Sequence, residues 1–203
     1  MLVGLTVARL TDEAVAAAQG LTEAAEATGN PYVISFVLLA YGLAVINADP
    51  SSSLASLRQG MAIAQDSGNR SNEAHFAANL CRHEALYGDP LAAIDSFAVA
   101  IRNYHDSGNA IIRSVLGLLA AFFDRLGRYE AAATIAGSAG VVPGAITSFA
   151  ETARALTHLR EVLGDQTYES LARKGETMTT AAMVTYAFDQ VDQARAELNA
   201  VSK

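Results

Sequence analysis

The residues best suited to chemistry crowd a single predicted helix in the middle of the chain. Glu73, His75, Cys81, His83 and Glu84 all lie there, and histidine, cysteine and carboxylate side chains are the usual ligands of zinc. Their spacing argues against one shared ion. Eight residues of helix separate the two histidines by about 12 Å, whereas a metal ion binds each nitrogen at about 2 Å. We therefore expect an exposed or groove-lining stripe that runs from His75 to His83, and no metal site.

The sequence also gives no support for catalysis by a nucleophile or by an acid–base pair. No Ser–His–Asp or Cys–His set can be assembled from the spacing. Cys81 takes a position where small side chains pack between helices, so we expect a buried and inert thiol. His105 precedes the turn residue Asp106 and is expected to place its charge at a helix C-terminus. The sequence thus predicts a protein with no enzymatic activity, no catalytic residues and no cofactor.

The elements that carry these residues are bounded by a turn that recurs three times. Thr28-Gly29-Asn30, Ser67-Gly68-Asn69 and Ser107-Gly108-Asn109 place their glycines 39 and 40 residues apart. Gly suits the left-handed position that ends a helix, and Asn is a good N-cap for the next helix. A fixed period of this length is typical of helical solenoids. We therefore expect each copy to separate two helices.

The boundaries together predict an all-α protein built of helical hairpins. No stretch between turn residues alternates apolar and polar side chains with a period of two, so no strand is expected. Ser148 with Glu151 is a candidate capping box, and Thr177 is the candidate N-cap of the last helix. The predicted helices span residues 12–28, 31–48, 50–67, 70–87, 90–106, 110–126, 128–138, 148–163, 165–174 and 177–201.

A small–large–small pattern at i, i+4 and i+7 on each second helix indicates the type of hairpin. Small residues there let the first helix approach closely, and the larger middle residue fills the groove between hairpins. The spacing resembles the second helix of tetratricopeptide (TPR) repeats, which implies a TPR-like α–α superhelix whose repeats of about 40 residues exceed the usual length of about 34. The triplets are Ala14/Ala18/Leu21, Ser53/Leu57/Gly60, Ala93/Phe97/Ala100 and Ala131/Ile135/Ser138.

Composition and charge restrict the classes of function. The chain of 203 residues has 14 basic and 21 acidic side chains and a net charge of −7. This charge argues against binding to nucleic-acid backbones, which need a basic face. The single cysteine cannot form an internal disulfide, and the longest apolar run, 32–46, is shorter than a membrane span of about 20 residues. We therefore expect a soluble, cytoplasmic protein that contacts neither nucleic acid nor membrane through this region.

The most specific resemblance lies in the C-terminal part of the chain. It rests on Leu159-Arg160-Glu161-Val162-Leu163-Gly164, on Tyr168, Gly175, Met178, Tyr186 and Ala187, and on the preceding run 130–139. Together they resemble the extreme C-terminal segment of the TPR-like region in actinobacterial multidomain ATPase regulators, both LuxR-type and nucleotidyl-cyclase-linked. The resemblance covers roughly residues 128–190. It implies the regulatory, protein-contacting part of a signalling ATPase or transcriptional regulator, although the chain has no glycine-rich phosphate loop.

Two regions are expected: TPR-like repeats over residues 1–138, and a C-terminal helical extension over residues 139–203 that packs on the array. Counting back from Ala14 places only half of the first repeat's first helix after Met1, and that half is apolar. The end of a solenoid normally carries a polar cap. We therefore expect that the chain was cut from a longer protein or that a second copy covers this end in a homodimer.

The first helices of stacked hairpins line the concave surface with which such repeats hold peptides or neighbouring domains. Projecting the repeat onto these helices predicts a partner-binding set of Ser35, His75, Asn79, Arg82 and Arg113. Its two arginines and its histidine are suited to pair with a partner's carboxylates. We expect an interaction and regulatory module whose partner is a protein, a peptide or another domain of its own parent chain. The alternative is a small-molecule sensor that binds an effector in its concave pocket.

Overall fold

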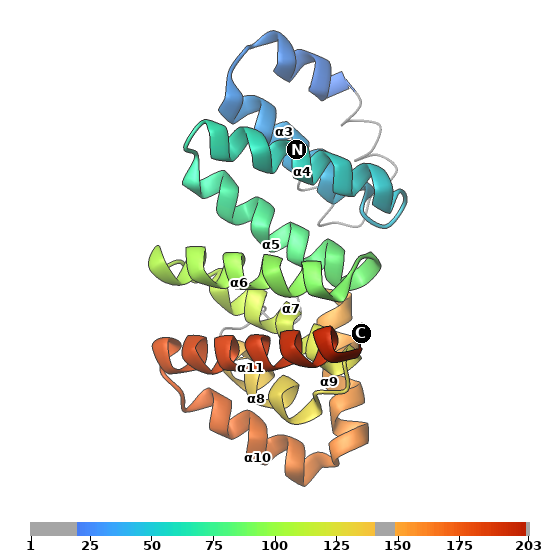
Figure 1. The fold of residues 1–203 in the computed structure, drawn as a ribbon, viewed down its shortest axis with the longest axis vertical. Coiled ribbons are helices and arrows are strands. Elements are labelled where there is room, and N and C mark those ends of the chain that lie inside the picture. Colours follow the sequence, from blue (N-terminus) through green and yellow to red (C-terminus); the bar gives the residue numbers. More distant parts are fainter. Residues whose placement is uncertain (1–19, 141–148, 202–203) are drawn as a thin grey trace. The chain divides into compact units, whose positions relative to one another are not determined.

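A computed structural model describes residues 20–140 and 149–201. The regular structure in these residues is helical, without a strand (Figure 1). The prediction of an all-α protein is confirmed. Residues 20–27 belong to a helix that precedes α3. The labelled helices are α3 (Pro31–Val45), α4 (Pro50–Asp66), α5 (Arg70–Tyr87), α6 (Pro90–Asp106), α7 (Ile112–Arg125), α8 (Tyr129–Gly140), α9 (Ala150–Leu163), α10 (Asp165–Glu176) and α11 (Thr180–Val201).

The chain forms two compact units, Met1–Ser96 and Phe97–Lys203, so their boundary falls within α6. The N-terminal unit contains α3, α4, α5 and the start of α6. The C-terminal unit contains the rest of α6 and the helices from α7 to α11. The boundary predicted between the repeats (residues 1–138) and the C-terminal extension (residues 139–203) was drawn from the repeat pattern. The division into compact units does not test it, so it stays a prediction.

The recurring turns end one helix and begin the next, as the sequence predicts. Gly29, Gly68 and Gly108 have φ angles of 61°, 68° and 64°, in the left-handed region that glycine enters without steric cost. In the second copy, the N–H groups of Gly68 and Asn69 donate to carbonyls in the last turn of α4, which is the Schellman arrangement. The Asn69 side chain then accepts a backbone N–H in the first turn of α5 at 3.1 Å.

Small residues set the distance between helices in the N-terminal unit. Gly42 of α3 faces Leu57 of α4, and a Cβ at Gly42 would lie 2.9 Å from the leucine side chain. The buried hydroxyls of Ser53 and Ser56 donate to the carbonyls of Gly42 and Leu38, at 2.8 and 2.9 Å, and so join α4 to α3. The core of the unit consists of Leu38, Leu39, Leu57, Ala64 and Phe76, with Ile34, Leu43, Met61, Ile63 and Leu80 packed against it.

The small–large–small triplets of α4, α6 and α8 lie on buried faces. Every member of these three triplets is buried, and the middle residues Leu57, Phe97 and Ile135 are 0% exposed. In the first triplet, Leu21 belongs to the described residues and is 41% exposed, while Ala14 and Ala18 lie outside them. The spacing therefore identified the packed faces of α4, α6 and α8, while Leu21 does not follow the pattern.

Two glycines bring α8 and α10 into backbone contact in the C-terminal unit. A Cβ at Gly137 would overlap the Ala172 carbonyl, and a Cβ at Gly175 would overlap the Thr134 carbonyl. Because backbone atoms cannot move aside as a flexible side chain can, each position requires glycine. The crossing therefore fixes how the C-terminal helices pack on the last predicted hairpin, α7–α8.

Arg128 joins the α7–α8 connection to α11. Its guanidinium donates to Glu197 at 2.6 Å, to Gln190 at 3.0 Å and to Gln193 at 3.1 Å, and it lies over the Phe123 ring. Hydrogen bonds from one guanidinium to several acceptors fix a geometry more firmly than a single exposed ion pair. The C-terminal helix is thus held to its unit by polar as well as apolar contacts.

One predicted helix start differs from the structure. Phe149 is the N-cap of α9, while Ser148 lies outside the described residues, so the predicted capping box stays a prediction. Thr177 is the C-cap of α10, and its hydroxyl donates back to the Lys174 carbonyl at 2.9 Å. Instead, Thr179 precedes α11 and accepts a backbone N–H of its first turn at 3.2 Å.

Over residues 20–140 and 149–201, the helices lack the combination of length and apolar character that crossing a membrane requires.

Candidate functional site

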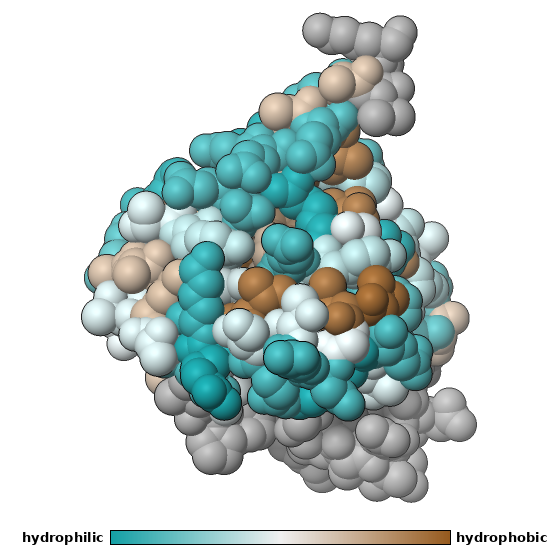
Figure 2. Space-filling view, turned by 90° about the horizontal axis from the view of Figure 1, so that it is seen from below, coloured by the Kyte–Doolittle hydropathy of each residue, from teal (hydrophilic) through white to brown (hydrophobic). Residues whose placement is uncertain are grey.

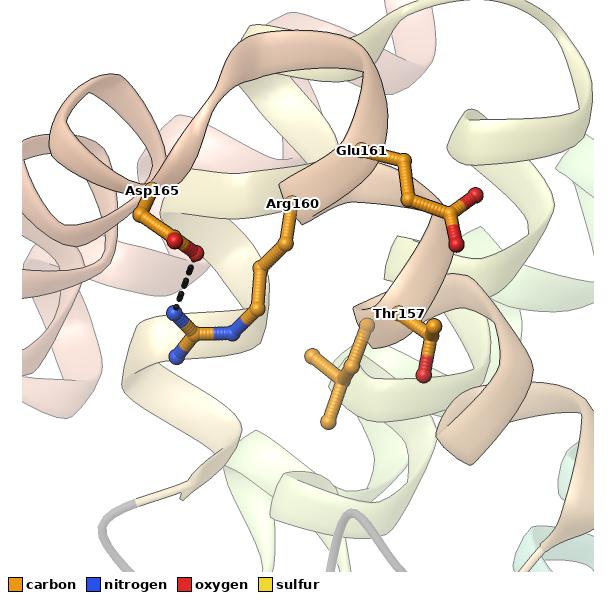
Figure 3. Close-up of a pocket in the computed structure, with 5 residues that line it drawn as sticks. Thr157, Arg160, Glu161 and Asp165 are labelled. Carbon is orange, nitrogen blue, oxygen red and sulfur yellow. Dashed lines mark hydrogen bonds and ion pairs between the residues drawn. The ribbon is translucent and has the colours of Figure 1, made fainter.

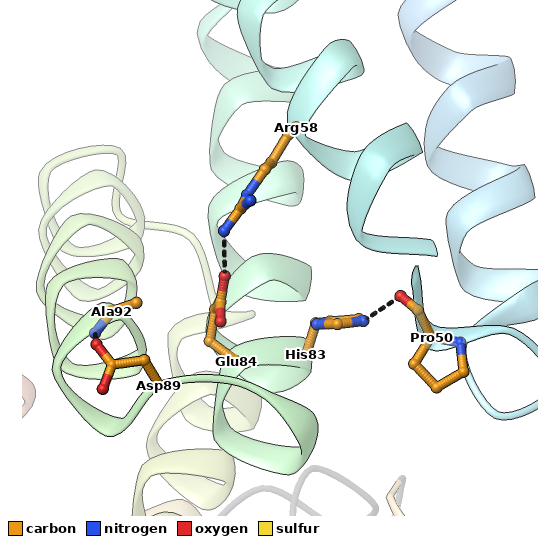
Figure 4. Close-up of polar contacts among 6 residues, drawn as sticks. All are labelled: Pro50, Arg58, His83, Glu84, Asp89 and Ala92. Carbon is orange, nitrogen blue, oxygen red and sulfur yellow. Dashed lines mark hydrogen bonds and ion pairs between the residues drawn. The ribbon is translucent and has the colours of Figure 1, made fainter. Parts of the chain in front are cut away.

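The acidic groups and the thiol of α5 are engaged in the fold. Glu84 is buried and accepts a hydrogen bond from Arg58 of α4 at 2.9 Å (Figure 4). Glu73 is also buried and accepts one from Arg70 at 2.9 Å. Cys81 is 0% exposed, and burial raises the pKa of its thiol. Among the described residues, no three histidines, cysteines or carboxylates gather where they could hold a metal ion.

His83 is buried, which corrects the stripe predicted to run from His75 to His83. Its Nε2 donates to the carbonyl oxygen of Pro50, at the start of α4, over 2.6 Å (Figure 4). Its Nδ1 is buried without a hydrogen-bond partner in the structure. At 3.6 residues per turn, eight residues turn a side chain about 80° away from the first. The two histidines therefore leave α5 in different directions.

One stripe of α5 stays partly exposed and carries polar side chains. His75, Asn79 and Arg82, at i, i+4 and i+7, are each intermediate between buried and exposed. Partial burial desolvates the imidazole of His75 and lowers its pKa. The side-chain amide of Asn79 donates to the backbone carbonyl of His75 at 2.8 Å. Three of the five predicted partner-binding residues thus share one face of one helix.

Ser35 does not reach that face, which corrects its predicted position. Its side chain is 0% exposed. Its hydroxyl donates to the Tyr32 carbonyl at 3.1 Å and accepts from the amide of Asn72 at 2.8 Å. The first contact lies within α3, and the second joins α5 to α3. Ser35 therefore helps to pack these two helices inside the N-terminal unit.

A shift of one residue explains this difference. Ser35 follows its N-cap, Asn30, by five residues, whereas His75 follows its N-cap, Asn69, by six. The residue of α3 that is equivalent to His75 is therefore Phe36. Phe36 is 46% exposed, as expected for a position on the open face. The predicted position on α3 is therefore one residue before the exposed one.

Phe36 stacks on a second exposed aromatic residue of α3. Tyr32 lies one turn earlier, with the ring centroids 6.3 Å apart and the ring planes 9° from parallel, and it is 55% exposed. Because α3 and α5 are in contact and begin from equivalent turns, the aromatic pair continues the stripe of α5. We refer to these five residues, Tyr32, Phe36, His75, Asn79 and Arg82, as the first-helix face.

Arg113, the fifth predicted residue, belongs to the C-terminal unit and is engaged there. Its Nη1 donates to the carbonyl and hydroxyl oxygens of Ser138, at 2.6 and 2.8 Å, near the end of α8. Its Nη2 donates to the Thr180 hydroxyl at 3.1 Å, at the start of α11. A cation at a helix C-terminus is favourable because the last carbonyls lack partners within the helix. The contacts of Arg113 thus join α7, α8 and α11.

The C-terminal unit has a shallow depression on α9 and the start of α10 (Figure 3). Its one cation, Arg160, is paired with Asp165 and with Glu169 and lies over the Tyr168 ring at 4.2 Å. Two carboxylates therefore offset the charge that would attract an anionic ligand. The depression is lined by Leu156, Thr157, Arg160, Glu161 and Asp165.

An acid–histidine pair in the C-terminal unit had no signal in the sequence. His158 of α9 lies with Nδ1 2.8 Å from a carboxylate oxygen of the buried Asp124 on α7, and its ring meets the edge of Tyr129 at 5.8 Å. The two residues are 34 positions apart, so local spacing could not reveal the pair. Its contacts join α7 to α9 within the unit.

The surface of the molecule on the side where α10 lies in Figure 1 is largely hydrophilic, with a small group of hydrophobic side chains at its centre (Figure 2). Small apolar groups of this kind are ordinary on soluble proteins. The exposed, stacked rings of Tyr32 and Phe36 are less common on a protein surface than scattered apolar side chains. Large aromatic side chains are usually buried in the core or in an interface.

Comparison of the chain with family models, with curated proteins and with solved structures finds no match.

Proposed function

We propose that this chain is a TPR-like helical-repeat module that binds protein segments on its first-helix face and has no catalytic role of its own. The observation that carries this proposal is the exposed Tyr32–Phe36 pair, which continues the polar stripe of α5. Interfaces are enriched in aromatic residues and arginine, and a few such residues supply most of the binding energy. The first-helix face contains both kinds.

The TPR-like part of the proposal is supported by recurrence in the fold. Successive hairpins begin after a glycine–asparagine turn, and their second helices bury a small–large–small triplet. The recurrence of the turn and of the buried triplet is typical of helical repeat proteins. Repeats of this kind offer the surface of their first helices to partners.

The regulatory part of the proposal rests on the resemblance of residues 128–190 to the C-terminal segment of actinobacterial ATPase regulators. In this proposal the chain is the protein-contacting region of a LuxR-type or nucleotidyl-cyclase-linked signalling ATPase or transcriptional regulator. Its partner is then either a separate protein or peptide or another domain of the parent chain.

Selection of binding peptides from a random library on the purified chain tests the proposal. Peptides that also bind the Tyr32→Ala/Phe36→Ala double variant are removed in a counter-selection. The control variant is Val162→Ala, which truncates an exposed apolar side chain of α9. We expect peptides that bind the wild type and Val162→Ala but lose at least about ten-fold in affinity, or about 1.4 kcal/mol, on the double variant.

A screen of metabolites by thermal shift tests the alternative of an effector sensor. A ligand that binds only the folded state raises the melting temperature in proportion to its concentration and affinity. A metabolite that does so, combined with a failure to select any peptide dependent on Tyr32 and Phe36, would overturn the proposed function in favour of the sensor.

A further inference from the structure

We infer that the exposed aromatic pair of α3, Tyr32 and Phe36, recognises proline-rich segments in the extended polyproline II conformation. This inference rests on the proposed function and specifies the partner's chemistry. Three features of α3 support it: the geometry of the two rings, the hydroxyl group of Tyr32 and the absence of charge around the pair.

The two rings form an exposed apolar surface one helical turn long. Because Tyr32 and Phe36 are four residues apart on the same helix, their spacing does not depend on how other helices pack. Their ring planes are 9° from parallel and their centroids are 6.3 Å apart. A polyproline II chain rises about 3.1 Å per residue, so residues at alternate positions lie about 6.2 Å apart along its axis. Two proline rings of one segment can therefore pack on the two aromatic rings.

The hydroxyl group of Tyr32 makes no hydrogen bond within the part of the chain that the structure describes. The backbone groups of Tyr32, in contrast, are engaged with Asn30 and Ser35. A tyrosine with an apolar ring and an unused hydroxyl group is typical of interfaces, where that group finds a partner. The carbonyl groups of a polyproline II segment have no acceptor role within the segment. The Tyr32 hydroxyl can therefore donate to one of them.

The chain around the pair carries no charge. Residues 27–48, which include the whole of α3, contain no Asp, Glu, Lys, Arg or His. A carboxylate that packed on the rings would lose water without gaining an opposite charge from α3. A proline-rich segment has no charge to desolvate, and its fixed φ angles leave little conformational freedom to lose on binding. Both properties suit a small, uncharged aromatic surface.

Fluorescence anisotropy with labelled peptides tests this inference on the full chain. The probe is octaproline. Its counterparts of the same length are a flexible Gly/Ser peptide and two Gly/Ser peptides that contain either a Phe pair or a Lys pair. We expect octaproline to bind at least about ten-fold more tightly than each counterpart, because it is already extended. Its affinity should change little when salt is added, because no charges take part.

Substitutions of the two aromatic residues locate the effect. Phe36→Ala removes one ring and should weaken octaproline binding about ten-fold or more. Val162→Ala, at an exposed apolar site of α9, should leave that binding unchanged. Tyr32→Phe keeps the ring and removes only the hydroxyl group, so it should weaken binding about two- to ten-fold. Tyr32 and Phe36 are both exposed, so these changes spare the core, and circular dichroism checks the fold of each variant.

The preference for proline is overturned if octaproline binds no more tightly than the counterparts, or if Phe36→Ala binds it as the wild type does. If the Phe or Lys peptide binds more tightly and still requires Tyr32 and Phe36, the proposed function stands and only the class of partner is wrong. If no peptide depends on those two residues, the proposed function fails together with this inference. Unchanged binding by Tyr32→Phe would overturn the role assigned to the hydroxyl group.

Discussion

Gly60 of α4 lies directly against the ring of Phe76 on α5, and a Cβ added to Gly60 would overlap the Cζ atom of that ring. Both residues are buried, so the ring cannot move aside without disturbing the core. The absence of a side chain at position 60 is therefore what lets α4 and α5 pack at their observed distance.

The substitution Gly60→Ala should destabilise the protein by about 1–3 kcal/mol, the usual cost of overpacking a core. This loss should appear even though alanine favours a helix over glycine by about 1 kcal/mol. The measurement is a denaturant titration followed by circular dichroism. Gln59→Ala, at an exposed position beside it, is the control and should change stability little. A Gly60→Ala protein as stable as the wild type would contradict the packing of α4 on α5.

The substitution Phe97→Ala should cost about 3–5 kcal/mol, as truncations of buried phenylalanine do. Phe97 is 0% exposed, and its ring lies 5.5 Å from that of Phe122, so truncation leaves a cavity within the C-terminal unit. Val99→Ala, on the exposed side of the same helix, is the matched control. The same denaturant titration decides the result. Similar effects of the two substitutions would show that the small–large–small register does not mark the core.

The protein should lose stability as the pH falls below about 6.5, and part of this loss should come from His75. Desolvation lowers the pKa of His75 from its ordinary value of 6.5, so the unfolded state binds the proton more tightly. The contribution of His75 is therefore complete above the unfolded pKa and is lost as the pH falls through the folded pKa. Urea titrations between about pH 7.5 and 5 measure it.

The substitution His75→Gln should flatten this pH dependence, because it removes the titrating group. Asn79→Ala, one turn away on the same stripe, should keep the wild-type dependence. If His75→Gln followed the wild-type curve throughout this range, the assigned contribution would be wrong.

The thiol of Cys81 should react with a thiol reagent only after the protein unfolds. It is 0% exposed, burial raises its pKa, and its S–H donates to the Ala78 carbonyl at 3.0 Å. The thiolate is the reactive form, so both access and ionisation are suppressed. Because Cys81 is the single cysteine, the reaction with a chromogenic disulfide reports on it alone. Rapid, stoichiometric labelling of the native protein would disprove the buried position.

Much of the helical architecture follows from short-range chemistry. A glycine at φ near 60–70° and an asparagine that caps the next helix act over a few residues, so Gly68 and Asn69 mark a boundary without reference to the rest of the chain. The spacing of Ser53, Leu57 and Gly60 is also local, because three positions separated by four and three residues share one helical face. These patterns predicted the all-α class and the buried faces of α4, α6 and α8.

The composition of the candidate site depended on tertiary structure. Ser35 and Phe36 are neighbours in the sequence, yet one is buried and the other is exposed, because the N-cap sets the rotation of α3. One residue turns a helix by about 100°, so an error of one position moves a side chain to another face. No composition or spacing argument corrects such an error when the connection to the next helix differs in length.

Pairs between distant residues were decided by the fold alone. Asp124 and His158 meet across 34 positions and Arg128 reaches Glu197 across 69, and nothing near any of these four residues predicts its partner. The sequence by itself determined most of the helix boundaries and the packed faces of α4, α6 and α8, since those depend on neighbours within a turn or two. Only the tertiary structure decided which polar groups pair across helices and which side chains, such as the ring of Phe36, stay at the surface, since that depends on how distant helices meet.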